Sequence, residues 1–230
     1  MNYYFLLEDE KSFFKVLPKW LEYMGFEAKR VADIKEVTEN CYVMQSGQGV
    51  TQLITRVLYQ TIDTILMDEN KGRIDELIII LDSEEMNVGD RKNDVKNKID
   101  KYLEEKGYIE FSYKIFVCNH CFETWLLGNQ KLYPEVEPLK ESDFWEYYNY
   151  YNVKSYDPEL MISPNLGNET TATYHFHYLH EMCRYNKIRY SKSKPDNLAK
   201  EEYFNELVTR IEITEHLKSF LEFYEYFKAK

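Results

Sequence analysis

The sequence is poor in the features that mark small secreted proteins and membrane proteins. Its 230 residues include 4 cysteines, too few for a disulfide framework. No apolar run approaches the roughly 20 residues of a membrane-spanning helix. Positive charge is also scarce, because 29 Lys and Arg face 40 Asp and Glu, for a formal net charge of −11. A chain this acidic does not bind nucleic acid over its whole surface, so a polyanion would need a local basic patch or bound cations.

The N-terminus lacks the pattern of a secretion signal. A strand-like apolar run, residues 3–7, is followed at once by three acidic residues, 8–10. We therefore expect a cytoplasmic protein with reduced thiols and no membrane association. Hydrophobic residues make up 44% of the chain, so it can bury a sizeable core and is not a disordered chain.

Apolar runs alternate with helical patterns over the first half of the chain. Strands are expected at four runs, residues 3–7, 41–44, 77–81 and 113–118. Helices are expected at residues 12–25 with a kink or late start at Pro18, at 50–65, at 94–106 with Gly107 as C-cap, and at 121–128. We predict an α/β fold with a mostly parallel central sheet of about four strands flanked by helices.

The character of the chain changes near residue 130. An irregular, Tyr-rich stretch follows, and helices are expected near residues 172–186 and 200–228. We predict an α/β domain over residues 1–130, and over 131–230 a Tyr-rich irregular segment with C-terminal helices that pack on that domain. These helices could form a lid, a dimer interface or a docking surface, which leaves a homodimer among the alternatives.

Two of the apolar runs end in clustered carboxylates. Glu8 follows the first run, and Asp82 and Glu84 follow the run at 77–81. Ligands of open parallel sheets bind beyond the carboxyl ends of the strands, so the clusters converge if the two strands are neighbours. Positions i and i+2 of an extended segment share a face, so Asp82 and Glu84 can reach one cation. Oxygen ligands of this kind suit Mg²⁺ or Mn²⁺, although each cluster alone also suits a helix cap.

Three segments resemble the Toprim domain of topoisomerases, primases and the OLD-family and RloB-like nucleases. The sequence LLE at 6–8 and the sequence LDSE at 81–84 stand where Toprim families have a Glu and an Asp-x-Asp. The third segment, NHCFETWLL at 119–127, resembles the RloB-like signature Asn-Pro-Cys-Phe-Glu-x-Trp-Leu-Leu. Together the three segments extend the resemblance over about residues 3–130, and they imply a Toprim-like fold with a C-terminal helical extension.

The resemblance implies a metal-dependent nuclease of phage defence, acting on DNA or RNA, tRNA included, beside an ABC- or AAA-type ATPase partner. Asp82 and Glu84 would hold Mg²⁺ or Mn²⁺, and Glu8 would add a ligand or act as general base. Glu123 would orient a ligand or bind a second metal, or simply be an acid at a helix N-terminus. Lys114 would contact a phosphate, or merely face solvent.

Three departures from the Toprim and RloB-like patterns keep other functions open. Asp9 stands where Toprim proteins usually have Gly, whose small size lets the backbone approach a phosphate. His120 replaces the Pro of the third segment, and Glu84 is a longer second carboxylate. A non-catalytic binding or regulatory protein that partners an ATPase is therefore a second hypothesis, and a phosphotransfer enzyme acting on a small nucleotide is a third.

The chain contains one basic run, with tyrosines among its cations. The five cations are Arg184, Lys187, Arg189, Lys192 and Lys194. Cations contact phosphates and Tyr stacks on unpaired bases, so we expect this run to hold nucleic acid unless it is a solvated loop.

Six cysteines and histidines in two clusters could be written as a zinc site. They are Cys118, Cys121, His175, His177, His180 and Cys183. The clusters have no spacing typical of a known zinc finger, and the first two thiols lie where small buried hydrophobes are expected.

Overall fold

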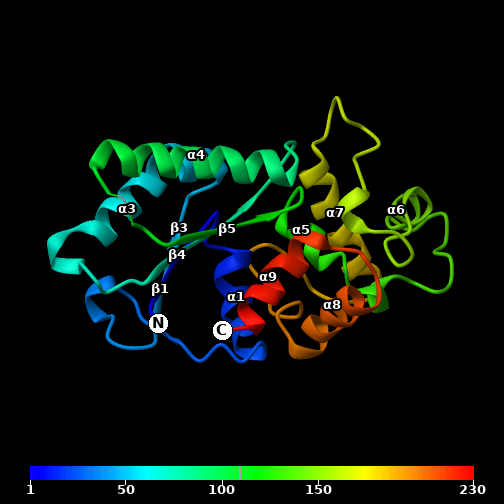
Figure 1. The fold of residues 1–230 in the computed structure, drawn as a ribbon. Helices are drawn as coiled ribbons and strands as arrows, with labels where there is room; N and C mark the ends of the chain where they lie inside the picture. The colour runs from blue at the N-terminus through cyan, green and yellow to red at the C-terminus, as the bar shows by residue number, and fades with distance from the viewer. Residues whose placement is uncertain (109) are drawn as a thin grey trace.

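The computed structural model describes residues 1–108 and 110–230 and shows a parallel five-stranded sheet between layers of helices (Figure 1). The strands are β1 (Tyr3–Leu7), β2 (Lys29–Arg30), β3 (Cys41–Ser46), β4 (Glu76–Asp82) and β5 (Tyr113–Cys118). They pair in the order β2-β3-β1-β4-β5, all parallel. The predicted α/β fold is confirmed and is consistent with a Toprim-like fold. The strand that the sequence pattern did not predict is β2, because its two residues are basic and exposed and carry no apolar pattern.

Successive residues of the strands point into two different cores. Phe5 packs into the core beneath α1 (Ser12–Tyr23), whereas Leu6 packs into the core on the opposite face. That opposite face is covered by the helical segment 50–66 and by α4 (Val88–Lys106), as Figure 1 shows. Because both faces are covered, the central strands are apolar at nearly every position.

Two helices of the first half differ from the sequence pattern. The segment predicted as one helix is α2 (Val50–Gln52), a π-helical turn over residues 53–57 and α3 (Leu58–Leu66). The helix α1 begins at Ser12 and contains Pro18, so the alternative of a late start is wrong. The predicted C-cap of α4 is confirmed, because Gly107 has a φ of 77°.

The second half contains more separate helices than predicted. Its helices are α5 (Phe122–Leu126), α6 (Trp145–Tyr150), α7 (Thr171–Tyr185), α8 (Glu201–Ile213) and α9 (Lys218–Lys228). Short 3-10 turns occur in both halves of the chain, at Ile34–Glu36, Asp68–Asn70, Gln130–Leu132 and Pro158–Leu160. The single helix expected over 200–228 is therefore two helices, which separate before Leu217, a residue with a φ of 53°.

The sheet and the C-terminal helices share one hydrophobic core. Phe227 of α9 packs against Phe5 and Phe116 of the sheet, with ring centroids 5.8 and 5.7 Å apart. The buried Arg210 guanidinium donates to the carbonyl oxygens of Gly128 at 3.0 Å and Val153 at 2.8 Å. These contacts fix the connections that lead from the sheet into the C-terminal helices.

Gly128 follows α5 and lies against Leu217, the residue that precedes α9. A Cβ at this position would stand 2.3 Å from Leu217 Cδ1 and 2.8 Å from the Trp125 carbonyl oxygen. Gly128→Ala is therefore expected to lower the free energy of unfolding by about 2 kcal/mol, measured by urea unfolding. Gly167→Ala is the control, because no atom lies within 4 Å of its added Cβ. Equal losses in both variants would contradict the steric argument.

Candidate carboxylate centre

Three carboxylates gather at the carboxyl edge of the sheet. Glu8 directly follows β1, Asp82 ends the neighbouring strand β4, and Glu123 lies in the first turn of α5 after β5. The Asp82 backbone N–H donates to Glu8 Oε2 at 2.7 Å, which joins the ends of β1 and β4. Glu123 is 1% exposed and lies close enough to Asp82 to shift its pKa. The predicted convergence of Glu8 and Asp82 is what the structure shows.

Burial and repulsion raise the pKa of two of these carboxyls. Burial, with smaller effects of the Glu84 and Asp9 charges, raises the pKa of Glu8 to about 7, although the hydrogen bond from the Asp82 N–H opposes this. Burial is also the main cause that raises the pKa of Asp82 well above its usual range, followed by repulsion from Glu8 and Glu123. The centre therefore retains protons near neutral pH unless a cation is close.

Two carboxylate oxygens in the centre lack hydrogen-bond partners. Asp82 Oδ1 and Glu123 Oε2 are buried, and neither has a partner among the described residues. A buried acceptor without a donor loses its hydration without compensation. Oxygen atoms of this kind fit a hard cation such as Mg²⁺. Within residues 1–108 and 110–230, however, no group of three or more His, Cys, Asp or Glu side chains is arranged to hold a metal ion.

Glu84 lies differently from the expectation. Its φ of 54° takes the backbone out of the extended region, so Asp82 and Glu84 do not share a face as an extended segment would require. The Glu84 side chain is 55% exposed, and its Oε2 lies 3.6 Å from the Arg91 guanidinium. The expectation of a shared face is wrong for this reason. The carboxylates that most affect the pKa of Asp82 are Glu8 and Glu123, and Lys192 and Asp9 have weaker effects.

Glu84 and His120 form a strained pair where β4 and β5 end. Both have left-handed backbones, with φ of 54° and 60°. The Glu84 N–H donates to the His120 carbonyl at 2.9 Å, and the His120 N–H donates to Ser83 Oγ at 2.8 Å. These bonds stabilise a conformation that is unfavourable for both residues. Proline cannot adopt it, because its ring fixes φ near −65°, so the departure from the RloB-like signature at this position accompanies a different backbone.

Lys192 supplies the cation nearest to the buried Glu123. Its Nζ lies 3.5 Å from Glu123 Oε1, which also accepts a hydrogen bond from the Tyr190 hydroxyl at 2.9 Å. Burial lowers the pKa of Lys192, but the Glu123 charge outweighs it together with weaker contributions from Cys121 and Asp82, so the pKa is raised overall. The sequence assigned Lys192 to nucleic-acid binding and gave no sign of this pairing.

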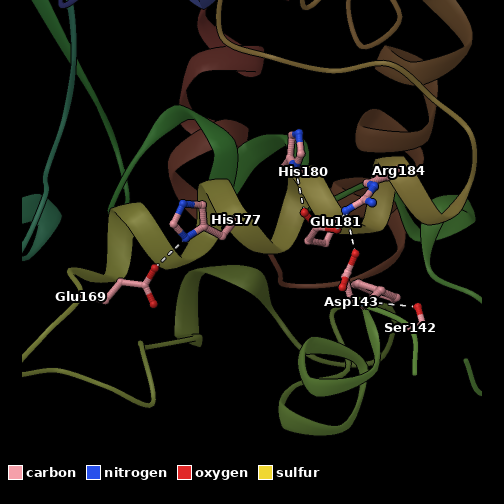
Figure 2. Close-up of polar contacts among 8 residues, drawn as sticks. Ser142, Asp143, Glu169, His177, His180, Glu181 and Arg184 are labelled. Atoms are coloured by element: carbon pink, nitrogen blue, oxygen red, sulfur yellow. Dashed lines mark hydrogen bonds and ion pairs between the residues drawn. The ribbon is translucent and has the colours of Figure 1, made fainter. Parts of the chain in front are cut away.

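The remaining cations of the basic run lie outside the centre. Arg184 of α7 is paired with Asp143 at 2.7 Å and with Glu181 at 3.3 Å, as Figure 2 shows. Lys187 and Arg189 line a surface hollow beside Arg184, and Lys194 is exposed outside it. The run therefore divides into one cation at the carboxylates, three at the hollow and one on open surface.

Lys114 is also remote from the carboxylate edge. It pairs in register with Ile78, whereas Asp82 pairs with Cys118 at the end of the strands. Its Nζ lies 3.9 Å from Glu222 Oε1 of α9. The structure thus does not bring Lys114 together with the carboxylates.

The cysteines and histidines are buried or paired with other groups. All four thiols are free and buried. His175 Nδ1 lies 2.7 Å from Thr124 Oγ1, and burial lowers its pKa to about 3, so His175 is a neutral core residue. His177 contacts Glu169 and His180 contacts Glu181 on the exposed face of α7 (Figure 2). These contacts favour core thiols, a core His175 and two surface histidines over a shared zinc site.

Comparisons with protein-family models, curated proteins and solved structures gave no match to this chain. The resemblance to Toprim and RloB-like proteins therefore depends on the three sequence segments. Among the described residues, no helix is long and apolar enough to cross a membrane.

Proposed function

We propose that this protein is a divalent-metal-dependent nuclease that hydrolyses phosphodiester bonds of DNA or RNA, tRNA included. The observation that carries the proposal is the meeting of Glu8, Asp82 and Glu123, with two buried oxygens unpartnered among the described residues. Ionisation of these crowded, buried carboxyls is unfavourable, and a bound cation would offset that cost. The resemblance to Toprim and RloB-like nucleases supports the same function.

Glu8 and Asp82 would hold Mg²⁺ or Mn²⁺, with Glu123 or the more exposed Glu84 as a further ligand. When bound, the metal would polarise the scissile phosphate and stabilise the charge that develops on it. The ligand set differs from the predicted one in that Glu123 lies nearer to Asp82 than the sequence pattern indicated.

The chain's own side chains have defined roles in this proposal. In the alternative in which Glu8 is not a ligand, its pKa of about 7 suits it to accept a proton from an attacking water near neutral pH. The hydrogen bond from the Asp82 backbone N–H to Glu8 Oε2 keeps the Glu8 carboxylate oriented. Lys192, already at the centre through Glu123, would contact a non-bridging phosphate oxygen once a cation shares that carboxylate.

A second function is favoured by the Lys192–Glu123 pair itself. In a non-catalytic binding or regulatory protein with an ATPase partner, Lys192 would be a permanent counter-ion, and a metal would not be required. Asp9 in place of the usual Toprim Gly is in keeping with this alternative.

Cleavage and metal binding separate the two functions. The protein is incubated with tRNA, single-stranded DNA and plasmid, in Mg²⁺, in Mn²⁺ and in EDTA. If the protein is a nuclease, cleavage should depend on the metal, and calorimetry should detect Mn²⁺ binding. Absence of both would support the non-catalytic protein. The proposed phage-defence role would gain support from an adjacent gene that encodes an ABC- or AAA-type ATPase.

A further inference from the structure

A surface hollow of about 400 Å³ lies at the C-terminal end of α7. Its lining consists of His180, Arg184, Lys187, Ile188, Arg189 and Tyr190. Three of these six side chains are cations in a chain whose net charge is −11. Cations concentrated around a concave surface create a local positive potential, so the hollow is suited to an anion.

The end of α7 brings these cations together. The Lys187 N–H donates to the Arg184 carbonyl at 3.0 Å, and the Ile188 N–H donates to the Cys183 carbonyl at 2.9 Å. Lys187 has a φ of 58°, so the chain reverses direction directly after the helix. This reversal places Lys187 and Arg189 beside the last turn of α7, where Arg184 lies.

Acidic neighbours limit the net charge of the hollow. Arg184 contacts Asp143 and Glu181, and His180 Nδ1 lies 3.0 Å from Glu181 Oε1 (Figure 2). Both carboxylates contact Arg184, which they orient, so three cations and two carboxylates leave only a small positive charge. Lys187 and Arg189 have no ion pair within the part of the chain that the structure describes. The balance fits one phosphate group better than a long polyanion.

One residue connects the hollow to the carboxylate centre. Tyr190 is among the residues that line the hollow, and its side-chain hydroxyl donates to the buried Glu123 Oε1 at 2.9 Å. The two places are therefore separated by about the length of a tyrosine, which is comparable to the spacing of neighbouring phosphates on a nucleic-acid strand.

We propose that the hollow binds a phosphate group of a nucleic-acid strand, adjacent to the phosphodiester at the carboxylate centre. The inference rests on the proposed nuclease function and specifies how the substrate is positioned. Lys187 and Arg189 supply the free charge, and Arg184 adds planar guanidinium donors. The phosphate is either a terminal monoester or an internal diester, since both present anionic non-bridging oxygens to the cations.

Binding without metal tests this proposal. A fluorescently labelled single-stranded oligonucleotide is titrated in EDTA and followed by anisotropy. The double variant with Lys187→Met and Arg189→Met is expected to bind about tenfold more weakly. The slope of log affinity against log salt concentration should fall by about 0.7, the value for one phosphate contact on a single strand. Lys194→Met is the matched control, because Lys194 belongs to the same run but does not line the hollow, and its affinity should change less than about twofold.

Two further arms identify the phosphate. If the double variant weakens binding of a 5′- or 3′-phosphorylated oligonucleotide only, the hollow holds a terminal phosphate. Equal weakening with an unphosphorylated oligonucleotide assigns it to an internal phosphate. Equal losses in the double variant and in Lys194→Met, or no loss in either, would overturn the proposal. Thermal unfolding confirms that each variant folds.

The result is separable from that of the cleavage assay. Since the titration contains no metal, a protein that binds the oligonucleotide through the hollow but never cleaves it would contradict the nuclease alone. A protein that cleaves normally when the hollow is altered, with unchanged affinity, would contradict the hollow alone.

Discussion

Asp82→Asn is expected to lower metal-dependent cleavage by at least about 100-fold and to make the metal-free protein more stable. Asn has the same shape but carries no charge for Glu8 and Glu123 to repel, and its amide can donate to an acidic neighbour. The backbone N–H that donates to Glu8 is retained. With metal chelated at pH 8, the free energy of unfolding should rise by about 1–3 kcal/mol.

Urea unfolding in EDTA measures the gain in stability, and cleavage in Mn²⁺ measures the loss of activity. Asp100→Asn is the control, because hydrogen bonds from Lys96 and Tyr113 lower the pKa of this exposed carboxyl. Its removal should leave cleavage unchanged and should not stabilise the protein. An Asp82→Asn protein that unfolds more easily than wild type would contradict the argument from repulsion, and one that cleaves normally would exclude Asp82 from the site.

A substitution that lowers activity but raises stability, as expected for Asp82→Asn, distinguishes a functional carboxylate from a structural one. A carboxylate kept for folding has its oxygens paired, so its loss destabilises the protein. Glu159 is such a residue, because it accepts hydrogen bonds from both the backbone and the hydroxyl of Ser219. Asp82 Oδ1 has no partner among the described residues, and the charge is retained at the expense of stability.

The sequence predicted the part of the site that depends on buried strands. The runs at residues 3–7 and 113–118 are strands with those bounds, because runs that are wholly apolar, or interrupted only by Lys114 near one end, require burial on both faces. Acids that follow such runs must lie at the carboxyl edge of a parallel sheet. The meeting of Glu8 and Asp82 therefore follows from the sequence once β1 and β4 are neighbours.

The rest of the centre depends on contacts that leave no local pattern. The left-handed conformation of Glu84 is fixed by hydrogen bonds with His120, which follows another strand. Lys192 and Tyr190 reach Glu123 from a turn that is distant in the sequence. Neither contact has a period or a spacing, so the sequence pattern did not indicate the turn at Glu84 or the pairing of Lys192 with Glu123.

Between pH 5 and pH 8 in EDTA, the wild-type protein is expected to lose about 2–3 kcal/mol of stability through Glu8. Its pKa is raised from 4.5 to about 7 on folding, so the folded state holds this proton more tightly than the unfolded state. The favourable contribution is complete below the unfolded value and disappears as pH rises through about 7. Glu8→Gln removes this titration, so its stability should fall less over this range, with the raised pKa of Asp82 still contributing.

Divalent metal should reverse this dependence on pH. A metal displaces the proton from Glu8, so Mn²⁺ should stabilise wild type more at pH 8 than at pH 5, and Glu8→Gln should respond weakly at both. Thermal unfolding with and without Mn²⁺ measures both effects, and Asp100→Asn provides the control for general ion effects. If wild type and Glu8→Gln responded equally to Mn²⁺, the metal would bind elsewhere. Glu8 would then be a buried carboxyl with a raised pKa that binds no metal. If Glu8→Gln weakened both the fall in stability with pH and the stabilisation by Mn²⁺, the same carboxylate would be responsible for both effects.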